Sequence, residues 1–144
     1  MSAAKKLANQ NERVYKVLVI DDSADSVEMM SRILSNNGCD ITMAFDGEDS
    51  EILLSKKDFD LVIVDWNMPN MNGRETLIMM DKILGNQKDA QGKNPSMPVV
   101  IYTAEEQENL DLPQCKFLTY VGFINKQQNF TSMSKSCSFI LRTI

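Results

Sequence analysis

Hydrophobic residues along the chain form short continuous runs separated by stretches of mixed polarity. Extended structure is predicted for five segments, three of them apolar at nearly every position, at residues 16–20, 39–44, 60–64, 98–103 and 120–125. Amphipathic spacing, terminal charges and stop signals predict helices between and after them, at residues 25–38, 47–57, 72–85, 105–110 and 129–144. The pattern is therefore a strand-helix alternation repeated about five times.

The continuously apolar strands indicate how the elements are layered. A strand that is apolar on both faces is typical of a parallel sheet covered by helices on both sides. Right-handed crossovers then give a doubly wound α/β fold, in which ligands bind at the carboxyl ends of the strands. One face of the last helix is apolar and is made of Phe130, Met133, Cys137, Ile140, Leu141 and Ile144.

Two segments depart from this regular alternation. Residues 86–96 are polar, with Gly92 and Pro95, and are expected to form a long exposed loop. Pro113 falls where the helix that starts at residue 105 would continue, and a proline inside a helix costs ~3 kcal/mol. We expect a short helix followed by an irregular segment, or an early start of the last strand.

Composition is typical of one globular domain. The 144 residues are 43% hydrophobic and 24% charged, and no apolar run approaches the ~20 residues of a membrane helix. Three scattered cysteines favour reduced thiols in a cytoplasm, and the absence of histidine excludes His-dependent catalysis and His-ligated metals. A net charge of −5 disfavours nucleic-acid binding. We expect a flexible N-terminal tail at 1–14 and one domain at 15–144.

Polar residues end most of the predicted strands. Asp21 and Asp22 follow the first strand, Asp65 the third, Thr103 ends the fourth and Lys126 follows the fifth. Neighbouring parallel strands lie ~4.8 Å apart, so these side chains should meet at one edge. Three close carboxylates repel one another, and Mg²⁺ or Mn²⁺ would relieve the repulsion. A carboxylate beside a metal, a hydroxyl and a lysine is suited to phosphoryl transfer.

Each of these residues also has a simpler interpretation by itself. The acidic pair could cap a helix or form a turn, and Asp65 could form a local turn before Pro69. Thr103 could form a capping box with Glu106, while Lys126 could be a solvated charge. Their occurrence at strand ends, in this order, favours a shared site.

In these residues, and over about 15–144, the chain resembles the receiver domain of two-component response regulators. The motifs DWNMPNMNG at 65–73 and TAEE at 103–106 are especially similar to the single-domain chemotaxis type. The resemblance implies a flavodoxin-like sheet of strand order 2-1-3-4-5. It also implies that Asp65 accepts a phosphoryl group from a histidine kinase or phosphotransfer protein, in a switch that catalyses its own phosphorylation and dephosphorylation rather than an enzyme.

The resemblance assigns a metal site as well. Asp22, Asp65 and the backbone carbonyl of Asn67 would bind Mg²⁺ directly, and Asp21 would act mainly through water. The side chain of Asn67 also matches a position that tunes the lifetime of the phosphoryl group.

The remaining assignments concern the phosphoryl group and the switch. Lys126 would pair with the phosphoryl group and Thr103 would hydrogen-bond it. Phe123 would rotate inward after Thr103, and Glu105 matches a second position that tunes the lifetime. Because the final helix ends at Ile144, we expect no output domain and a signal that leaves by contact with a downstream protein target.

Some features differ from the family pattern. Gln127 follows Lys126 where the family has a proline after a cis bond, so we expect a trans bond here. The irregular region around Pro113 alters a surface that commonly carries output, and an apolar edge strand at 120–125 makes a homodimer a hypothesis. These differences motivate one alternative, a pseudo-receiver that acts as an interaction module without regulation by phosphate.

Overall fold

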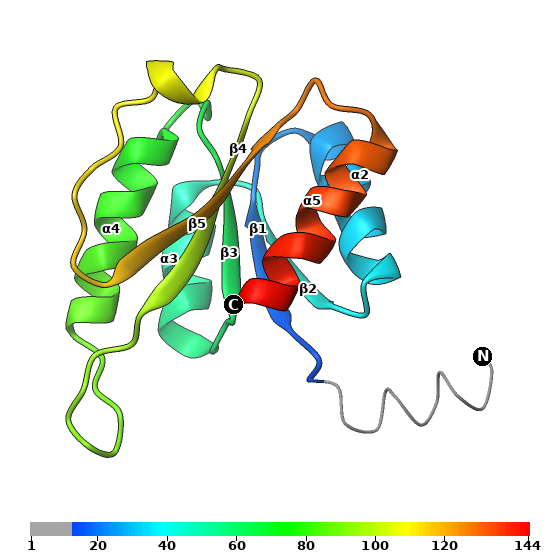
Figure 1. The fold of residues 1–144 in the computed structure, drawn as a ribbon. Coiled ribbons are helices and arrows are strands. Elements are labelled where there is room, and N and C mark those ends of the chain that lie inside the picture. Colours follow the sequence, from blue (N-terminus) through cyan, green and yellow to red (C-terminus); the bar gives the residue numbers. More distant parts are fainter. Residues whose placement is uncertain (1–12) are drawn as a thin grey trace, which may run out of the picture.

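The computed structural model describes residues 13–144; residues 1–12 of the expected tail lie outside the described residues. One sheet of five parallel strands has the order β2-β1-β3-β4-β5, as the resemblance implied, with β5 at an edge (Figure 1). The strands are β1 (Lys16–Ile20), β2 (Asp40–Ala44), β3 (Leu61–Asp65), β4 (Met97–Thr103) and β5 (Leu118–Asn125). The helices are α2 (Ala24–Asn36), α3 (Gly47–Lys56), α4 (Gly73–Gly85) and α5 (Phe130–Thr143), with a 3₁₀ turn η1 (Gln107–Asn109).

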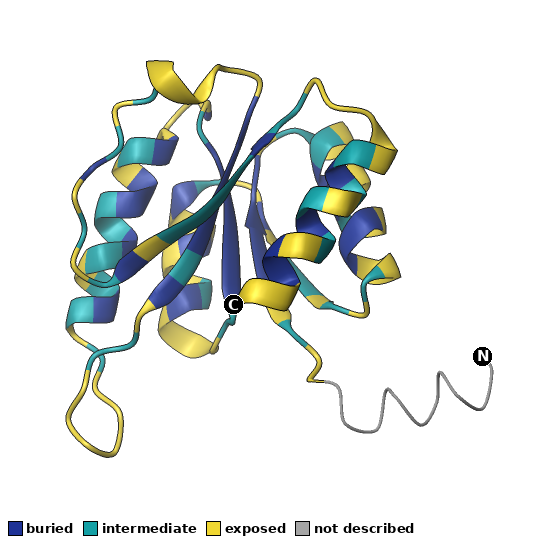
Figure 2. Cartoon of the chain, in the orientation of Figure 1, coloured by how far each residue is buried: buried dark blue, intermediate teal, exposed yellow. Residues whose placement is uncertain are grey.

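Two apolar cores lie on opposite faces of the sheet. Helices α2 and α5 cover one face and α3 and α4 the other, and each helix buries one side only (Figures 1 and 2). Alternate residues of a strand point to opposite faces. Val17, Val19 and Ile63 accordingly belong to the α2/α5 core, whereas Leu18 and Val64 belong to the α3/α4 core. The doubly wound α/β class predicted from the strands is confirmed.

Polar side chains fix where the helices begin. Each of the four α-helices starts after a residue whose side chain accepts a hydrogen bond from the backbone N–H three positions later; these are Ser23, Asp46, Asn72 and Asn129. Such caps satisfy one of the free N–H groups of the first turn and contribute ~1 kcal/mol each. The acidic pair at 21–22 therefore does not cap α2.

The segment between β4 and β5 is largely extended. The helix predicted at 105–110 is reduced to the single turn η1, and β5 begins two positions before the predicted residue 120. The backbone N–H of Phe117 donates to Asp81 Oδ1 on α4 at 2.8 Å, and the Tyr120 hydroxyl donates to the Pro113 carbonyl at 2.8 Å. Hydrogen bonds to α4 and β5 thus hold this extended segment in place at Phe117 and Pro113.

The prediction for the apolar face of α5 is wrong at its first position. Met133, Cys137, Ile140 and Leu141 are buried, whereas Phe130, the first residue of α5, is 38% exposed. Among the helices of residues 13–144, none has the length and apolar character needed to cross a membrane.

Candidate functional site

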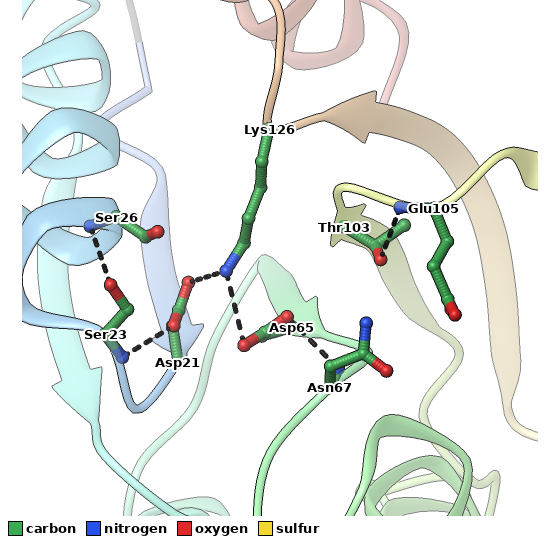
Figure 3. Close-up of polar contacts among 8 residues, drawn as sticks. All are labelled: Asp21, Ser23, Ser26, Asp65, Asn67, Thr103, Glu105 and Lys126. Atoms are coloured by element: carbon green, nitrogen blue, oxygen red, sulfur yellow. Dashed lines mark hydrogen bonds and ion pairs between the residues drawn. The ribbon is translucent and has the colours of Figure 1, made fainter.

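Figure 3 shows six of the predicted site residues together at the carboxyl edge of the sheet: Asp21, Asp65, Asn67, Thr103, Glu105 and Lys126. Asp21 directly follows β1 and is fully buried, and Asp65 ends β3 with 3% of its surface exposed. By strand alternation both side chains continue the α2/α5 face. Asp22, one residue further along, is exposed at the rim.

In each of the two buried carboxylates, one oxygen accepts a hydrogen bond in a local turn and the other faces the site. The backbone N–H of Ser23 donates to Asp21 Oδ1 at 2.9 Å, and that of Asn67 donates to Asp65 Oδ1 at 3.2 Å. The turn interpretation is therefore correct for one oxygen of each carboxylate. The other oxygens, both Oδ2, face the Lys126 ammonium at 3.0 Å from Asp21 and 3.3 Å from Asp65.

Lys126 is held at both its backbone and its side chain. Its N–H donates to the Thr103 carbonyl at 2.8 Å, which ties the end of β5 to the end of β4. The Lys126–Gln127 bond is trans, as expected, and the Gln127 N–H donates to Asn125 Oδ1 at 2.8 Å. Only 19% of the lysine side chain is exposed. The interpretation of Lys126 as a solvated charge is wrong.

The surroundings of Asp65 raise its pKa to about 6. Burial is the largest cause, and the negative charge of Asp21 adds to it. The Lys126 ammonium and the Asn67 N–H act in the opposite direction without cancelling the first two effects. Asp65 is thus a carboxylate whose ionised form the folded protein disfavours.

An excess of negative charge in a small volume suits a divalent cation. Asp21, Asp22 and Asp65 can each present one oxygen such that the three atoms lie within 4.8 Å of one another. Asp21 Oδ2 is buried and, among the described residues, makes the ion pair with Lys126 but no hydrogen bond. Hard oxygen donors with free coordination capacity fit Mg²⁺ or Mn²⁺.

Thr103 lies on the other face of the sheet edge. Its hydroxyl is buried and accepts a hydrogen bond from the Glu105 N–H at 3.1 Å. The predicted capping box between Thr103 and Glu106 does not form, because the turn η1 begins only at residue 107 and its first N–H groups receive no side-chain cap. Phe123 pairs with Ile101 across β4 and β5 and packs against the α3/α4 core. A cleft of about 170 Å³ opens beside Thr103 and Phe123.

The structure also brings in a residue that the sequence analysis did not select. Tyr102 is the register partner of Asp65 in β4, and its ring centroid lies 5.0 Å from Lys126 Nζ. In the sequence it is one more apolar position of a buried strand. Strand alternation from Thr103 could have placed it on the face of the acidic pair.

A comparison with known families decides the identity of the fold. The model described as "Response regulator receiver domain" matches residues 17–137. The chain belongs to this family. This receiver domain thus shares its fold with signalling proteins of two-component systems, as its motifs implied.

Curated relatives differ in how much of their length the match spans. Chemotaxis protein CheY-3 of Vibrio cholerae is 34% identical over 91 residues, covering 62% of this chain and 64% of that protein. The glycerol metabolism activator of Pseudomonas putida is 29% identical over 133 residues, covering 89% and 54%. Transcriptional regulatory protein ZraR of Salmonella typhimurium is 31% identical over 88 residues, covering 61% and 18%. The match thus spans 18% to 64% of the length of these relatives.

Solved structures share the fold. Chemotaxis protein CheY4 of Vibrio cholerae has a TM-score of 0.63 and 23% identity, over 89% of this chain and 99% of that one. CheY of Borrelia burgdorferi, in a complex with CheX, BeF₃ and Mg²⁺, has a TM-score of 0.64 and 21% identity, over 88% and 89%. Because both identities are below 25%, these similarities show a shared fold and nothing further.

Proposed function

We propose that this receiver domain is a phosphorylation switch in which Asp65 accepts a phosphoryl group in a Mg²⁺-dependent reaction. The observation that carries the proposal is the position of Asp65: its Oδ2 lies 3.3 Å from the Lys126 ammonium, beside Asp21, at the carboxyl edge of a receiver sheet. The donor would be the phosphohistidine of a histidine kinase or phosphotransfer protein, or a small acyl phosphate.

The transfer itself is a substitution at phosphorus. A carboxylate oxygen of Asp65 forms the new P–O bond while the P–N bond of the phosphohistidine breaks, and its electron pair returns to the imidazole nitrogen. With a pKa of about 6, Asp65 is mostly ionised near neutral pH and can act as the nucleophile. The Lys126 ammonium is placed to offset the negative charge that the phosphoryl oxygens bring.

The metal site would be completed by the acidic group. Asp22, Asp65 and the Asn67 carbonyl would hold Mg²⁺ directly, and Asp21 would act through water. Bound there, Mg²⁺ would neutralise charge on the equatorial phosphoryl oxygens. This assignment is supported by three carboxylate oxygens that can approach within 4.8 Å of one another.

The output would begin at Thr103. A phosphoryl group on Asp65 would attract the Thr103 hydroxyl, which now accepts from the Glu105 N–H. Phe123 would then rotate into the cleft of about 170 Å³ that both residues line. The exposed side chains of Asn67 and Glu105 would tune how fast water removes the phosphoryl group.

The consequence of the switch would be a change in protein–protein contacts. Repacking of Phe123 alters the surface around β5, and a downstream protein target would recognise one of its two states. The related CheY in complex with CheX supports recognition of this kind. A cytoplasmic location would give the domain access to a kinase.

The test is covalent labelling with acetyl phosphate in Mg²⁺. We expect a mass gain of ~80 Da that chelation of Mg²⁺ and Asp65→Asn both abolish. Asp58→Asn, which changes an exposed aspartate just before β3, is the matched control and should still be labelled. Lack of labelling in the unmodified protein would refute the proposal and leave the pseudo-receiver as the better description.

A second readout uses Trp66, which adjoins Asp65 and is partly buried. Its fluorescence should change with Mg²⁺ and again with beryllofluoride, a mimic of the phosphoryl group. A flat response to both would contradict a working metal site.

A further inference from the structure

Tyr102 occupies a place that brings an aromatic ring into the site. It lies opposite Asp65 in the β3–β4 register and is 2% exposed. Residues paired in a parallel sheet point to the same face, so the ring shares the α2/α5 side with Asp21 and Asp65. The Lys126 ammonium, which arrives from the loop after β5, lies 5.0 Å from the ring centroid. This distance is within the range of a cation–π contact.

Among the described residues, the Lys126 ammonium also makes two ion pairs. Its ammonium pairs with Oδ2 of Asp21 and of Asp65. Under the proposed function both carboxylates change during the cycle, because they face the metal and Asp65 becomes an acyl phosphate. Metal binding weakens the attraction of the carboxylates for the ammonium, and phosphorylation moves the negative charge from the Asp65 carboxylate to the phosphoryl oxygens. The ring of Tyr102 undergoes neither change.

The ring also keeps a constant charge. Burial, followed by the charge of Asp21, raises the pKa of Tyr102 to about 12, so its hydroxyl stays protonated near neutral pH. A neutral ring attracts a cation through its quadrupole and does not compete for Mg²⁺. Tyr102 is therefore suited to hold the long, flexible side chain of Lys126, whose ammonium lies 5.0 Å from the ring centroid.

We propose that Tyr102 is a positioning residue for Lys126, and that its ring keeps the ammonium beside Asp65 while the carboxylates are engaged. The proposal rests on the proposed function for its kinetic consequence. The contact itself exists independently of phosphorylation, so the two can fail separately. Two variants separate the ring from the hydroxyl: Tyr102→Leu removes both, and Tyr102→Phe restores the ring alone.

The first measurement is the proton chemical shift of the Lys126 side chain by NMR. An ammonium above a ring has its neighbouring CH₂ protons moved upfield by the ring current. We expect this upfield shift in the protein without substitutions and in Tyr102→Phe, with Mg²⁺ and beryllofluoride present. It should disappear in Tyr102→Leu. No displacement in the unmodified protein would overturn the proposal.

The second measurement is the rate constant of phosphorylation by acetyl phosphate. Loss of a contact of this class corresponds to a fall of about 2- to 30-fold in Tyr102→Leu. Tyr102→Phe should recover most of the lost rate, whereas an equal loss in both variants would assign the effect to the hydroxyl and overturn the proposal. In a Lys126→Ala background, Tyr102→Leu should cause no further fall, because the residue acts through the lysine.

Folding controls keep these outcomes interpretable. Far-UV circular dichroism establishes that each variant is folded. Tyr102→Met, which removes the ring but leaves an unbranched, more adaptable side chain, replaces Tyr102→Leu if the latter is not folded. A full additional loss of rate in the Lys126→Ala background would indicate a structural role and overturn the proposal. If the unmodified protein takes up no phosphoryl group, the proposed function fails, while the NMR experiment still decides whether Tyr102 positions Lys126.

Discussion

The buried carboxylate of Asp65 should cost the folded protein stability, and its removal should therefore be stabilising. Asp65→Asn replaces the carboxylate with a neutral group of nearly the same shape. Asp65 is 3% exposed and lies in a group of three acidic residues. Although the variant loses the ion pair with Lys126, burial and the charge of Asp21 outweigh that pair, because the pKa of Asp65 is raised overall.

The size and sign of the effect follow from proton linkage. The pKa of Asp65 is about 6 in the folded protein, against an ordinary value of 3.8. Between these values the folded protein binds more protons than the unfolded chain, so its stability falls as pH rises through this window. The difference corresponds to about 3 kcal/mol, at ~1.4 kcal/mol per pKa unit. This is the upper limit expected for Asp65→Asn above about pH 7.

Urea denaturation at several pH values provides the assay. Without Mg²⁺, Asp65→Asn should have the larger free energy of unfolding at about pH 8, and this advantage should vanish below about pH 4. Mg²⁺ should stabilise the unmodified protein more than the variant, because it binds the folded carboxylates. The exposed control Asp58→Asn should stay within about 0.5 kcal/mol of the unmodified protein. Equal stabilities at pH 8, or a difference independent of pH, would refute the reasoning.

Three further substitutions test how the site and its surroundings are built. In Gly73→Ala the new Cβ would lie 2.7 Å from Trp66 Cα, so the loop must shift; we expect a loss of about 1–3 kcal/mol and altered Trp66 fluorescence. Gly85→Ala in the same helix meets only a side chain, at 3.0 Å, and should cost less. Asp81→Ala removes the acceptor of the Phe117 N–H and should lower the free energy of unfolding by about 1–3 kcal/mol in urea, whereas an unchanged midpoint would show that this hydrogen bond does not hold the segment.

Much of the fold could be predicted because burial leaves a local pattern in the sequence. The apolar run at 16–20 coincides with β1, and the run at 60–64 is shifted from β3 by one position. Such strands are covered on both faces, which makes every position apolar. Residues 105–117 lacked a signal of this kind. Pro113 indicated where a helix would fail, but the extended course of the segment depends on Asp81, 36 positions from Phe117.

In the site, too, some residues could be predicted from the sequence and others could not. Asp21, Asp65, Thr103 and Lys126 could be selected from the sequence because parallel strands bring their carboxyl ends to one edge, so position at a strand end implies proximity. Tyr102 could not be selected by this rule. Its apolar ring is what any buried strand position accepts, and its relation to Lys126 depends on the path of the loop after β5.

The sequence by itself thus determined the strand-helix alternation, the edge at which chemistry can occur, and the residue types available for it. These properties follow from local periodicity and from the geometry of parallel strands. Only the tertiary structure decided that the Lys126 ammonium lies between two carboxylates and a ring, that the pKa of Asp65 is raised, and that an extended segment replaces a helix before β5. Each of these depends on distances between residues far apart in the chain, which no local pattern encodes.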